Sequence, residues 1–239
     1  MIVKNDLLYY ENLKIYQDNE SFVFSLDSVL LPKFIDIPKS TRKILDIGTG
    51  NAPIPLVLST RTSAKIVGVE IQSDIAELAR KSVLENHLES QIEIVAEDIK
   101  KTTYEAESFD IVLSNPPYFK VDENSYLSEK KSKLIARHEV ALDLESLVKI
   151  ATKYLKHNGI FGLVHRPERL ADIIDICRKN KLEVKKVQFV YPKKNEEANI
   201  VLVEAVKNGK SGLKVLEPII TYENGKYTEQ IMKYFKGSE

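Results

Sequence analysis

The sequence predicts an α/β fold with a mostly parallel central sheet and helices on both of its faces. Short apolar runs alternate with segments of helical spacing, which is the pattern of βα units. The first run leads directly into a glycine-rich turn. A chain of 239 residues with 43% hydrophobic content can bury roughly 70% of its unfolded surface. The expected strands are residues 43–47, 65–69, 91–95, 109–113, 160–164, 182–190 and 198–205.

The same periodicity predicts the helices and the direction of the last strand. Residues 74–86 and 144–155 carry apolar side chains at helical spacing. Between the last two apolar runs, residues 191–199 form a polar break that contains Pro192. This break is short enough for a hairpin, so we expect the last strand to be antiparallel.

An N-terminal appendage precedes the core, which we place at residues 43–206. Residues 1–42 are predicted to pack on that core. They contain an aromatic-rich segment over 7–24 that predicts a hairpin, followed by a helix capped by Asp27 that reaches about Phe34.

A C-terminal extension, residues 207–239, follows the core. It is mixed in character, with a turn at Asn224-Gly225 and a short amphipathic end over 228–235. Because the chain shows no repeat, low-complexity tract or linker, we expect one compact domain overall.

The turn after the first strand predicts a site for a nucleotide-like ligand. Asp46, Gly48, Gly50 and Asn51 lie where a strand passes into a helix. Glycine lets the backbone approach a ligand closely, and the first N–H groups of the helix are free to face it. The nicotinamide fingerprint fails here, because its third glycine would fall at Pro53.

Two carboxylates follow the next two strands and extend this site. Glu70 ends its strand about twenty residues after the turn, where it suits the ribose hydroxyls. Asp98 follows the third strand and suits an adenine amino group. Ile71 and Ile99, the residues after them, are predicted cofactor contacts. Together these positions fit S-adenosylmethionine better than a dinucleotide.

Residues 115–118 read Asn-Pro-Pro-Tyr and predict a device for methylating a planar nitrogen. The lone pair of such a nitrogen is delocalised until its hydrogens are held. Asn115 Oδ1 and the Pro116 carbonyl are placed to accept them, and each proline keeps the residue before it extended. Tyr118 would stack on the base, with Pro117 and Phe119 beside it as substrate contacts. Asn115 is also a predicted cofactor contact.

In their order and spacing, Asp46-x-Gly48-x-Gly50, Glu70, Asp98 and the Asn-Pro-Pro-Tyr tetrapeptide resemble the class I S-adenosylmethionine-dependent methyltransferases that modify amino groups or amides. From about residue 13 to 227, the chain further resembles the bacterial enzymes that methylate N6 of the adenine just 3′ of the anticodon in a valine tRNA. The segments that carry this second likeness are residues 22–31, 68–72, 137–139 and 164–170.

This resemblance implies a Rossmann-like methyltransferase sheet of seven strands, S-adenosylmethionine as cofactor, and tRNA, through its anticodon stem-loop, as substrate. It places Phe24, Asp27 and Ser28 as a lid over the methionine end of the cofactor. The chain departs from the family at Ala52, where members usually carry glycine. The alanine adds a methyl group beside the expected methionine moiety.

Basic residues cluster locally although 35 Lys and Arg balance 35 Asp and Glu. Net charge therefore does not favour nucleic acid. The cluster beside the proposed acceptor pocket is the best candidate for RNA phosphates. It comprises Lys130, Lys131, Lys133 and Arg137, whereas the clusters at Lys185, Lys186, Lys193 and Lys194 and at Lys207, Lys210 and Lys214 suit solvated surface equally well.

Several classes of protein are excluded or disfavoured. A single cysteine, Cys177, cannot form an intramolecular disulfide and is expected to pack on the helix over 167–180. The four histidines lack metal-ligand spacing, so no metal is expected. We find neither a signal peptide nor a run of about 20 apolar residues, and expect a cytoplasmic protein without membrane contact. A monomer or weak homodimer is the expected state.

Other functions remain open within and outside this chemistry. The same tetrapeptide also occurs in enzymes that methylate glutamine amides of peptide release factors. Those enzymes, however, carry a larger N-terminal domain than this chain does. A ribosomal RNA guanine-N2 or DNA adenine-N6 methyltransferase uses this tetrapeptide as well. The alternative that is not an enzyme is an RNA-binding protein that has lost its catalytic activity, and Ala52 would be the sign of that loss.

Each site residue also has a purely structural interpretation. Asp46 and Asp27 would cap helices, and Glu70 would be an exposed carboxylate at a strand end. Glu97 competes with Asp98 for the ligand. The Arg-His-Glu segment at 137–139 would close its loop by an ion pair.

Overall fold

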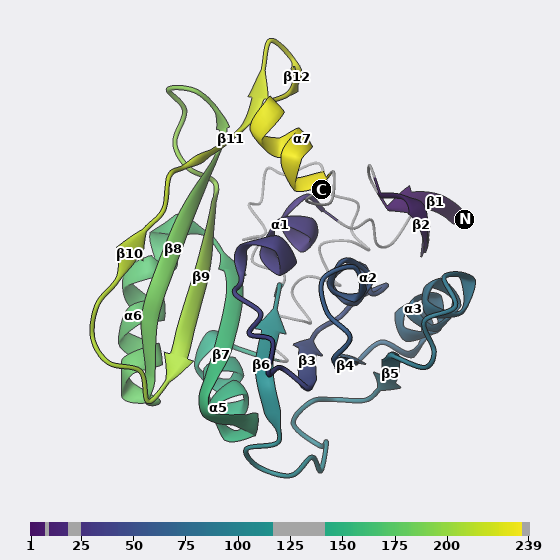
Figure 1. Cartoon of the computed structure of the whole chain (residues 1–239), viewed down its shortest axis with the longest axis horizontal. Helices are drawn as coiled ribbons and strands as arrows, with labels where there is room; N and C mark the ends of the chain where they lie inside the picture. Colours follow the sequence, from purple (N-terminus) through teal and green to yellow (C-terminus); the bar gives the residue numbers. More distant parts are fainter. Residues whose placement is uncertain (8–9, 19–24, 117–141, 236–239) are drawn as a thin grey trace, which may run out of the picture.

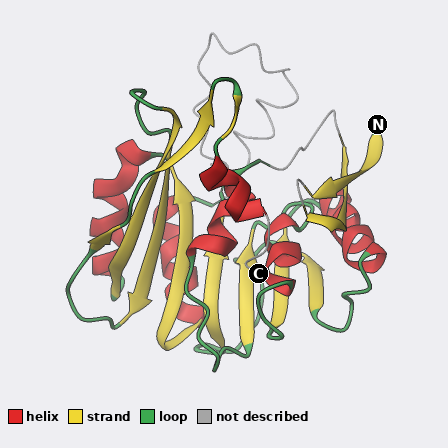
Figure 2. Cartoon of the chain, turned by 45° about the horizontal axis from the view of Figure 1, so that its top comes forward, coloured by secondary structure: helices red, strands yellow, loops and turns green. Residues whose placement is uncertain are grey.

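The computed structural model of the chain describes residues 1–7, 10–18, 25–116 and 142–235. These residues form a large mixed sheet with helices on both faces, and a separate two-stranded hairpin beside it (Figure 1, Figure 2). The α/β fold class that the sequence predicts is confirmed.

The large sheet contains all of the expected strands and three short additional ones. Their order across the sheet is β12-β11-β8-β9-β7-β6-β3-β4-β5, with β10 also paired to β8. The bounds are β3 (Lys43–Ile47), β4 (Lys65–Glu70), β5 (Ile92–Ala96), β6 (Phe109–Ser114), β7 (Leu155–His165), β8 (Leu182–Lys193), β9 (Ile200–Lys207), β10 (Lys214–Val215), β11 (Ile219–Glu223) and β12 (Lys226–Tyr227).

Strand direction matches the expectation. The strands from β7 to β5 are parallel, whereas β9 lies antiparallel between β7 and β8. β7 begins at Leu155, five residues before the predicted start, because Leu155 already pairs with Phe109. β9 begins two residues later than expected, at Ile200, since the N–H of Asn199 closes the preceding loop onto the Val190 carbonyl.

The helices divide between the two faces of the sheet. One hydrophobic cluster joins that sheet to α1, α2, α3, α7 and the hairpin, and a second joins it to α5 and α6. Cys177 of α6 is fully buried in the second cluster, as expected, and burial raises the pKa of its thiol to about 12. The bounds are α1 (Asp27–Phe34), α2 (Pro53–Ser59), α3 (Ser73–Glu85), α5 (Leu144–Tyr154), α6 (Leu170–Lys179) and α7 (Glu229–Phe235), with a single 3-10 turn, η1 (Pro167–Arg169).

The hairpin consists of β1 (Ile2–Leu7) and β2 (Tyr10–Asp18), with Ile2 paired to Asp18. The predicted range of 7–24 was therefore wrong at its start. The apolar pattern of the sequence does not predict β1, because most of its side chains are exposed and only the last, Leu7, is buried. The expected turn at Asn224-Gly225 is confirmed between β11 and β12, where both residues have positive φ.

The prediction that Asp27 caps a helix was also wrong. Asp27 is the first residue of α1 and is buried, and no side-chain cap hydrogen bond is made at Leu26, the residue before it. The N–H of Ser28 instead bonds to the Ser25 carbonyl, and the N–H groups of Val29 and Leu30 bond to that of Leu26. The preceding backbone turn thus satisfies the amides that a side-chain cap would have bound.

Within the four described ranges, no helix is long and apolar enough to span a bilayer. In those same ranges, no three His, Cys, Asp or Glu side chains gather in a way that would hold a metal ion.

Candidate active site

The predicted site residues meet because four parallel strands end side by side. Ile47 of β3 is level with Ser114 of β6 and with Val69 of β4, and Glu70 is level with Ala96 of β5. Asn115, the residue after β6, therefore lies level with the start of the loop that follows β3. The carboxyl edge of a parallel sheet is where ligands bind in folds of this kind.

The loop after β3 turns sharply because three of its residues have left-handed backbone conformations. Gly48 and Gly50 have φ of 73° and 57°, which glycine adopts without cost. The N–H of Gly48 bonds to the Val69 carbonyl at 2.9 Å, and a Cβ built on Gly48 would meet no atom within 4 Å. The loop surface at Gly48 is thus open to a ligand.

Ala52 completes this turn in the same left-handed region, with φ of 72° and ψ of 33°. The departure from glycine noted in the sequence thus falls at a position where a side chain strains the backbone. Ala52 is fully buried, and its methyl group belongs to the first hydrophobic cluster. Burial of the methyl group therefore offsets part of the strain.

Asp46 is a fully buried carboxylate, and neither of its oxygens has a hydrogen-bond partner among the residues that the structure describes. Burial raises its pKa to about 7, and the charge of Glu70 adds to the rise. The nearby Thr49 hydroxyl acts in the other direction and lowers this pKa. Among the described residues, however, the Thr49 hydroxyl oxygen makes no hydrogen bond of ordinary geometry. Two buried acceptor oxygens without hydrogen bonds suit a ligand that carries N–H or O–H groups.

Glu70 is buried as well, but its two oxygens are already engaged with the main chain. Oε2 accepts from the N–H of Gly50 and Oε1 from that of Gln72, each at 3.0 Å. The carboxylate therefore holds the loop in place. Each oxygen keeps a second lone pair, so the predicted contact with ribose hydroxyls is still available. Ile71, directly after it, is 45% exposed at the same edge.

Asp98 and Ile99 differ in their surroundings. Asp98 is half-buried, and its Oδ1 accepts from the N–H of Lys100 at 3.0 Å, which closes a turn. Ile99 is buried in the second hydrophobic cluster. Glu97, the competing carboxylate, is exposed, and its N–H bonds to the Glu70 carbonyl. Asp98 is thus the more enclosed of the two acids.

Asn51 ties the loop to the hairpin. Its Nδ2 donates to the Tyr16 carbonyl of β2 at 2.9 Å, whereas its Oδ1 is buried and lacks a partner within the described ranges. The same holds in those ranges for the buried Oε1 of Gln17, the next residue of β2. The hairpin therefore lies against the proposed cofactor loop.

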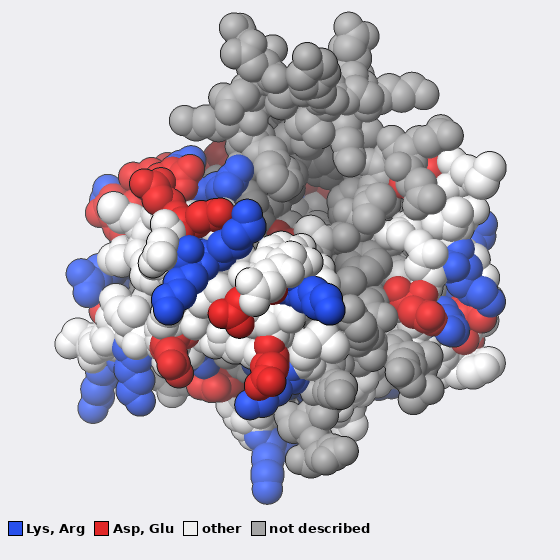
Figure 3. Space-filling model, turned by 90° about the horizontal axis from the view of Figure 1, so that it is seen from above, with Lys and Arg blue, Asp and Glu red and all other residues white. Residues whose placement is uncertain are grey.

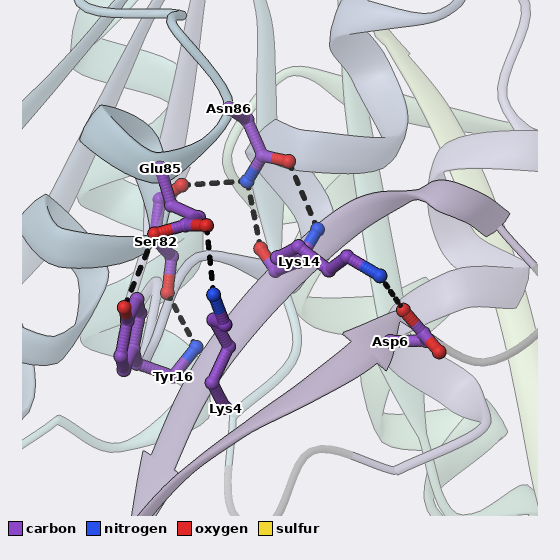
Figure 4. Close-up of polar contacts among 7 residues, drawn as sticks. All are labelled: Lys4, Asp6, Lys14, Tyr16, Ser82, Glu85 and Asn86. Atoms are coloured by element: carbon purple, nitrogen blue, oxygen red, sulfur yellow. Dashed lines mark hydrogen bonds and ion pairs between the residues drawn. The ribbon is translucent and has the colours of Figure 1, made fainter.

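Side chains of α3, and that of Asn86 directly after it, hold the hairpin in this position (Figure 4). Asn86 accepts from the N–H of Lys14 at 2.9 Å and donates to its carbonyl at 2.7 Å, as a neighbouring strand would. The N–H of Tyr16, two residues after Lys14 in β2, donates to the Ser82 hydroxyl at 2.9 Å. Glu85 binds both the Tyr16 hydroxyl and the Lys4 ammonium.

Asn115 is the residue on which the acceptor chemistry depends. Its Nδ2 donates to the hydroxyl of Ser28 on α1 at 2.9 Å, and its Oδ1 is buried and has no partner in the described part of the chain. Ser28 and Asp27 are both buried at the start of α1. Pro116 follows and is half-buried. A planar amide is thus held by its nitrogen, with its oxygen left for a donor.

The unpartnered buried atoms around the strand ends share one chemical character. They are all oxygens, contributed by Asp46, Thr49, Asn51 and Asn115. A cationic ligand with several N–H and O–H groups complements such a set, and an anionic one does not. S-adenosylmethionine, which carries an ammonium, a sulfonium, ribose hydroxyls and an adenine amine, fits this requirement.

His165 ends β7 one strand beyond β6. It is buried, and its Nδ1 accepts from the N–H of Arg166 at 2.8 Å. Burial, with the charge of Arg169 adding to the effect, lowers its pKa to about 4. The lowered pKa makes the imidazole of His165 a weak proton acceptor.

Two of the sequence-predicted basic clusters contain lysines with internal roles. Lys186 bonds to Glu204 and Asp36 at 2.9 and 3.0 Å, beside a hollow of about 730 Å³ between α1, α7 and β8. Lys207 is buried and donates to Glu107 and to two main-chain carbonyls. Seen from above, the described surface carries charges of both signs intermixed (Figure 3). The ammonium groups of both lysines are thus engaged in bonds within the protein.

Some predicted residues lie outside the described part of the chain. They are Phe24, Pro117, Tyr118, Phe119, Lys130, Lys131, Lys133 and Arg137. Conversely, the sequence interpretation did not assign Thr49 or Gln17 to the site, whereas the resemblance placed Ser28 over the cofactor together with Phe24 and Asp27. No local pattern marks Thr49 or Gln17 as site residues.

The sequence of this chain is similar to those of known methyltransferases. A family described as a methyltransferase domain matches residues 38–230. A tRNA1(Val) (adenine(37)-N6)-methyltransferase of Phocaeicola vulgatus is 31% identical over 199 residues, which is 83% of each chain. A protein of the same name from Parabacteroides distasonis is 25% identical and covers 95% of this chain and 94% of its own.

Solved structures share the fold at lower identity. A predicted O-methyltransferase of Agrobacterium tumefaciens superposes with a TM-score of 0.68 at 22% identity, covering 87% of this chain and 94% of its own. Geranyl diphosphate C-methyltransferase of Streptomyces coelicolor, crystallised with S-adenosyl-L-homocysteine, reaches 0.57 at 10% identity, with 76% and 75% covered. These likenesses concern the fold.

Proposed function

This chain belongs to the methyltransferase domain family, as an S-adenosylmethionine-dependent enzyme, and we propose that it methylates N6 of an adenine in tRNA. The proposed target is adenine 37, the nucleotide 3′ of the anticodon, in tRNA1(Val). The name and the 83% coverage of the Phocaeicola vulgatus relative support this target. The observation that carries the chemistry is the buried, unpartnered Oδ1 of Asn115, level with the glycine loop.

The cofactor site is proposed to consist of the strand-end carboxylates and the loop. When bound, S-adenosylmethionine supplies an activated methyl group on a cationic sulfur. Asp46 would accept from donor groups of the cofactor, and a bound cation would favour its ionised form despite burial. Glu70 would accept from the ribose hydroxyls while holding Gly50, and Asp98 from the adenine amine.

The acceptor site has to make an aromatic amine nucleophilic. Asn115 Oδ1 and the Pro116 carbonyl would each accept one hydrogen of the amine, which draws its lone pair out of conjugation. The proline after Asn115 restricts the backbone there, so the acceptor is set before the substrate arrives. Once methylated, the nitrogen releases one of these hydrogens as a proton. Tyr118 is predicted to stack on the base.

The test is methyl incorporation from labelled S-adenosylmethionine into total tRNA that lacks the modification, followed by nucleoside analysis. N6-methyladenosine in a valine tRNA fraction is the expected product. Peptide release factor, ribosomal RNA and duplex DNA are assayed in parallel. Incorporation into one of these instead of tRNA would overturn the proposed substrate, and no incorporation with the cofactor bound would overturn the proposed activity on all of them.

A further inference from the structure

We infer that Ser28 is a positioning residue for methyl transfer, because its hydroxyl holds the Asn115 amide with Oδ1 directed toward the reacting nitrogen. The inference rests on the proposed function of Asn115. It concerns a residue of the N-terminal appendage, 87 positions away in the chain from the amide it contacts.

The first argument is the geometry of the amide itself. An asparagine side chain rotates readily about its last torsion, so an unheld carboxamide presents nitrogen and oxygen in turn. In the structure Nδ2 donates to Ser28 Oγ at 2.9 Å, and this fixes the plane of the group. Among the described residues the buried Oδ1 has no hydrogen-bond partner, so it is available to accept a hydrogen from a substrate amine.

The second argument is that Ser28 is itself held firmly. It is 6% exposed, and its N–H bonds to the Ser25 carbonyl at 3.1 Å. Ser28 is therefore part of the first turn of α1 and not of a loose loop. A supporting residue of this kind fixes a reacting group at no cost when the substrate binds.

The third argument is the close seating of α1 on the sheet. Gly162 of β7 leaves room for it, since a Cβ there would come within 2.5 Å of Leu113 and 2.8 Å of Ile35. Leu31 and Ile35 occupy the space above this glycine. A larger residue at 162 would lift α1 and with it the Ser28 hydroxyl. The appendage thus supplies a part of the site that residues 43–206 lack.

The decisive variants are Ser28→Ala, Ser28→Thr, Asn115→Ala and the double variant Ser28→Ala/Asn115→Ala. We expect Ser28→Ala to lower the single-turnover rate of methyl transfer about tenfold, the effect of one lost hydrogen bond. Affinity for S-adenosylhomocysteine should stay unchanged. Ser28→Thr, which keeps the hydroxyl, should restore most of the rate. Ser25→Ala, at an exposed serine one turn earlier, is the matched control.

The double variant separates positioning from a structural role. If Ser28 acts through Asn115, removing it from a chain that already lacks the Asn115 amide costs no further rate, so the two effects are not additive. If Ser28 has only a structural role, Ser28→Ala should lower the rate of methyl transfer by the same factor in the wild type and in the Asn115→Ala variant. An additive result, or a Ser28→Ala rate equal to the wild type, overturns the inference.

A second readout does not depend on activity. The side-chain NH2 resonances of Asn115, identified by their loss in Asn115→Ala, should shift and exchange faster with solvent in Ser28→Ala. Unchanged resonances overturn the inference. Kinetics are measured on whichever substrate the wild type methylates, so a failed tRNA assay counts against the proposed function while the resonances still decide the role of Ser28.

Discussion

The Oε2 atom of Glu70 accepts a hydrogen bond of 3.0 Å from the main-chain N–H of Gly50, which joins the end of β4 to the loop after β3. The same carboxylate binds the N–H of Gln72 through its other oxygen. One buried side chain thus holds the loop and is also the proposed acceptor for the ribose hydroxyls.

Replacing Glu70 with Gln should therefore weaken the cofactor site twice over. A glutamine keeps one oxygen but turns an NH2 group toward the second N–H, which leaves that N–H unpaired. We expect affinity for S-adenosylhomocysteine, measured by calorimetry, to fall at least about tenfold. Glu97→Gln, at an exposed carboxylate on the same edge, is the control and should bind normally. Equal affinity in both variants would contradict the role of Glu70.

Asp46 should make the free protein less stable as pH rises. Its pKa is raised from 3.8 to about 7 in the fold, so between these values the folded state holds a proton that the unfolded state has released. Stability contributed by this group is thus present at low pH and is lost as pH rises toward about 7.

Urea denaturation at pH 5 and pH 8 measures this effect. The wild type should lose midpoint stability relative to Asp46→Asn between the two conditions, because asparagine does not titrate. Asp74→Asn, at an exposed position, should retain the wild-type dependence. Parallel pH profiles for the wild type and Asp46→Asn would show that Asp46 ionises without penalty.

Asn115→Ala should reduce methyl transfer to a small residual rate while cofactor affinity changes only a few-fold. Oδ1 of this amide is the proposed acceptor for the substrate amine, whereas Asp46 and Glu70 are the main proposed cofactor acceptors. Single-turnover assays and calorimetry on the same preparation separate the two effects. A variant that loses cofactor binding would show that Asn115 serves the cofactor instead.

Ala52 tests the strain in the cofactor loop. At φ of 72°, a β-branched side chain is strongly disfavoured, so Ala52→Val should cost more than about 2 kcal/mol of unfolding free energy. Ala52→Gly relieves strain but loses a buried methyl group, so we expect a net change within about 1 kcal/mol. Thermal or urea unfolding decides, and a stable Val variant would contradict the left-handed conformation.

Asn86→Ala should loosen the hairpin that lies against the cofactor loop. It removes the partner of both main-chain groups of Lys14, so hydrogen exchange over residues 10–18 should accelerate. Lys4→Ala removes only an exposed ion pair with Glu85 and should change exchange little. Similar exchange in the Asn86→Ala variant and the wild type would show that packing alone holds the hairpin.

Local patterns in the sequence were sufficient for most strands of the sheet and for the turn after β3. Apolar runs such as Lys43–Ile47 predict buried strands because burial on both faces of a parallel sheet leaves a continuous apolar signal. The glycines at 48 and 50 predict a turn because few other residues adopt positive φ. β1 gave no such signal, since an exposed strand at the margin of the fold needs no apolar face.

The tertiary structure alone decided which of these residues act together. Ser28 and Asn115 are 87 positions apart, and Lys14 and Asn86 are 72 apart, so their contacts follow from the seating of α1 and the hairpin. The raised pKa of Asp46 likewise comes from surroundings contributed by several segments. Periodicity and turn chemistry are properties of neighbours in the chain, whereas burial, hydrogen-bond partners and pKa arise only when distant segments pack.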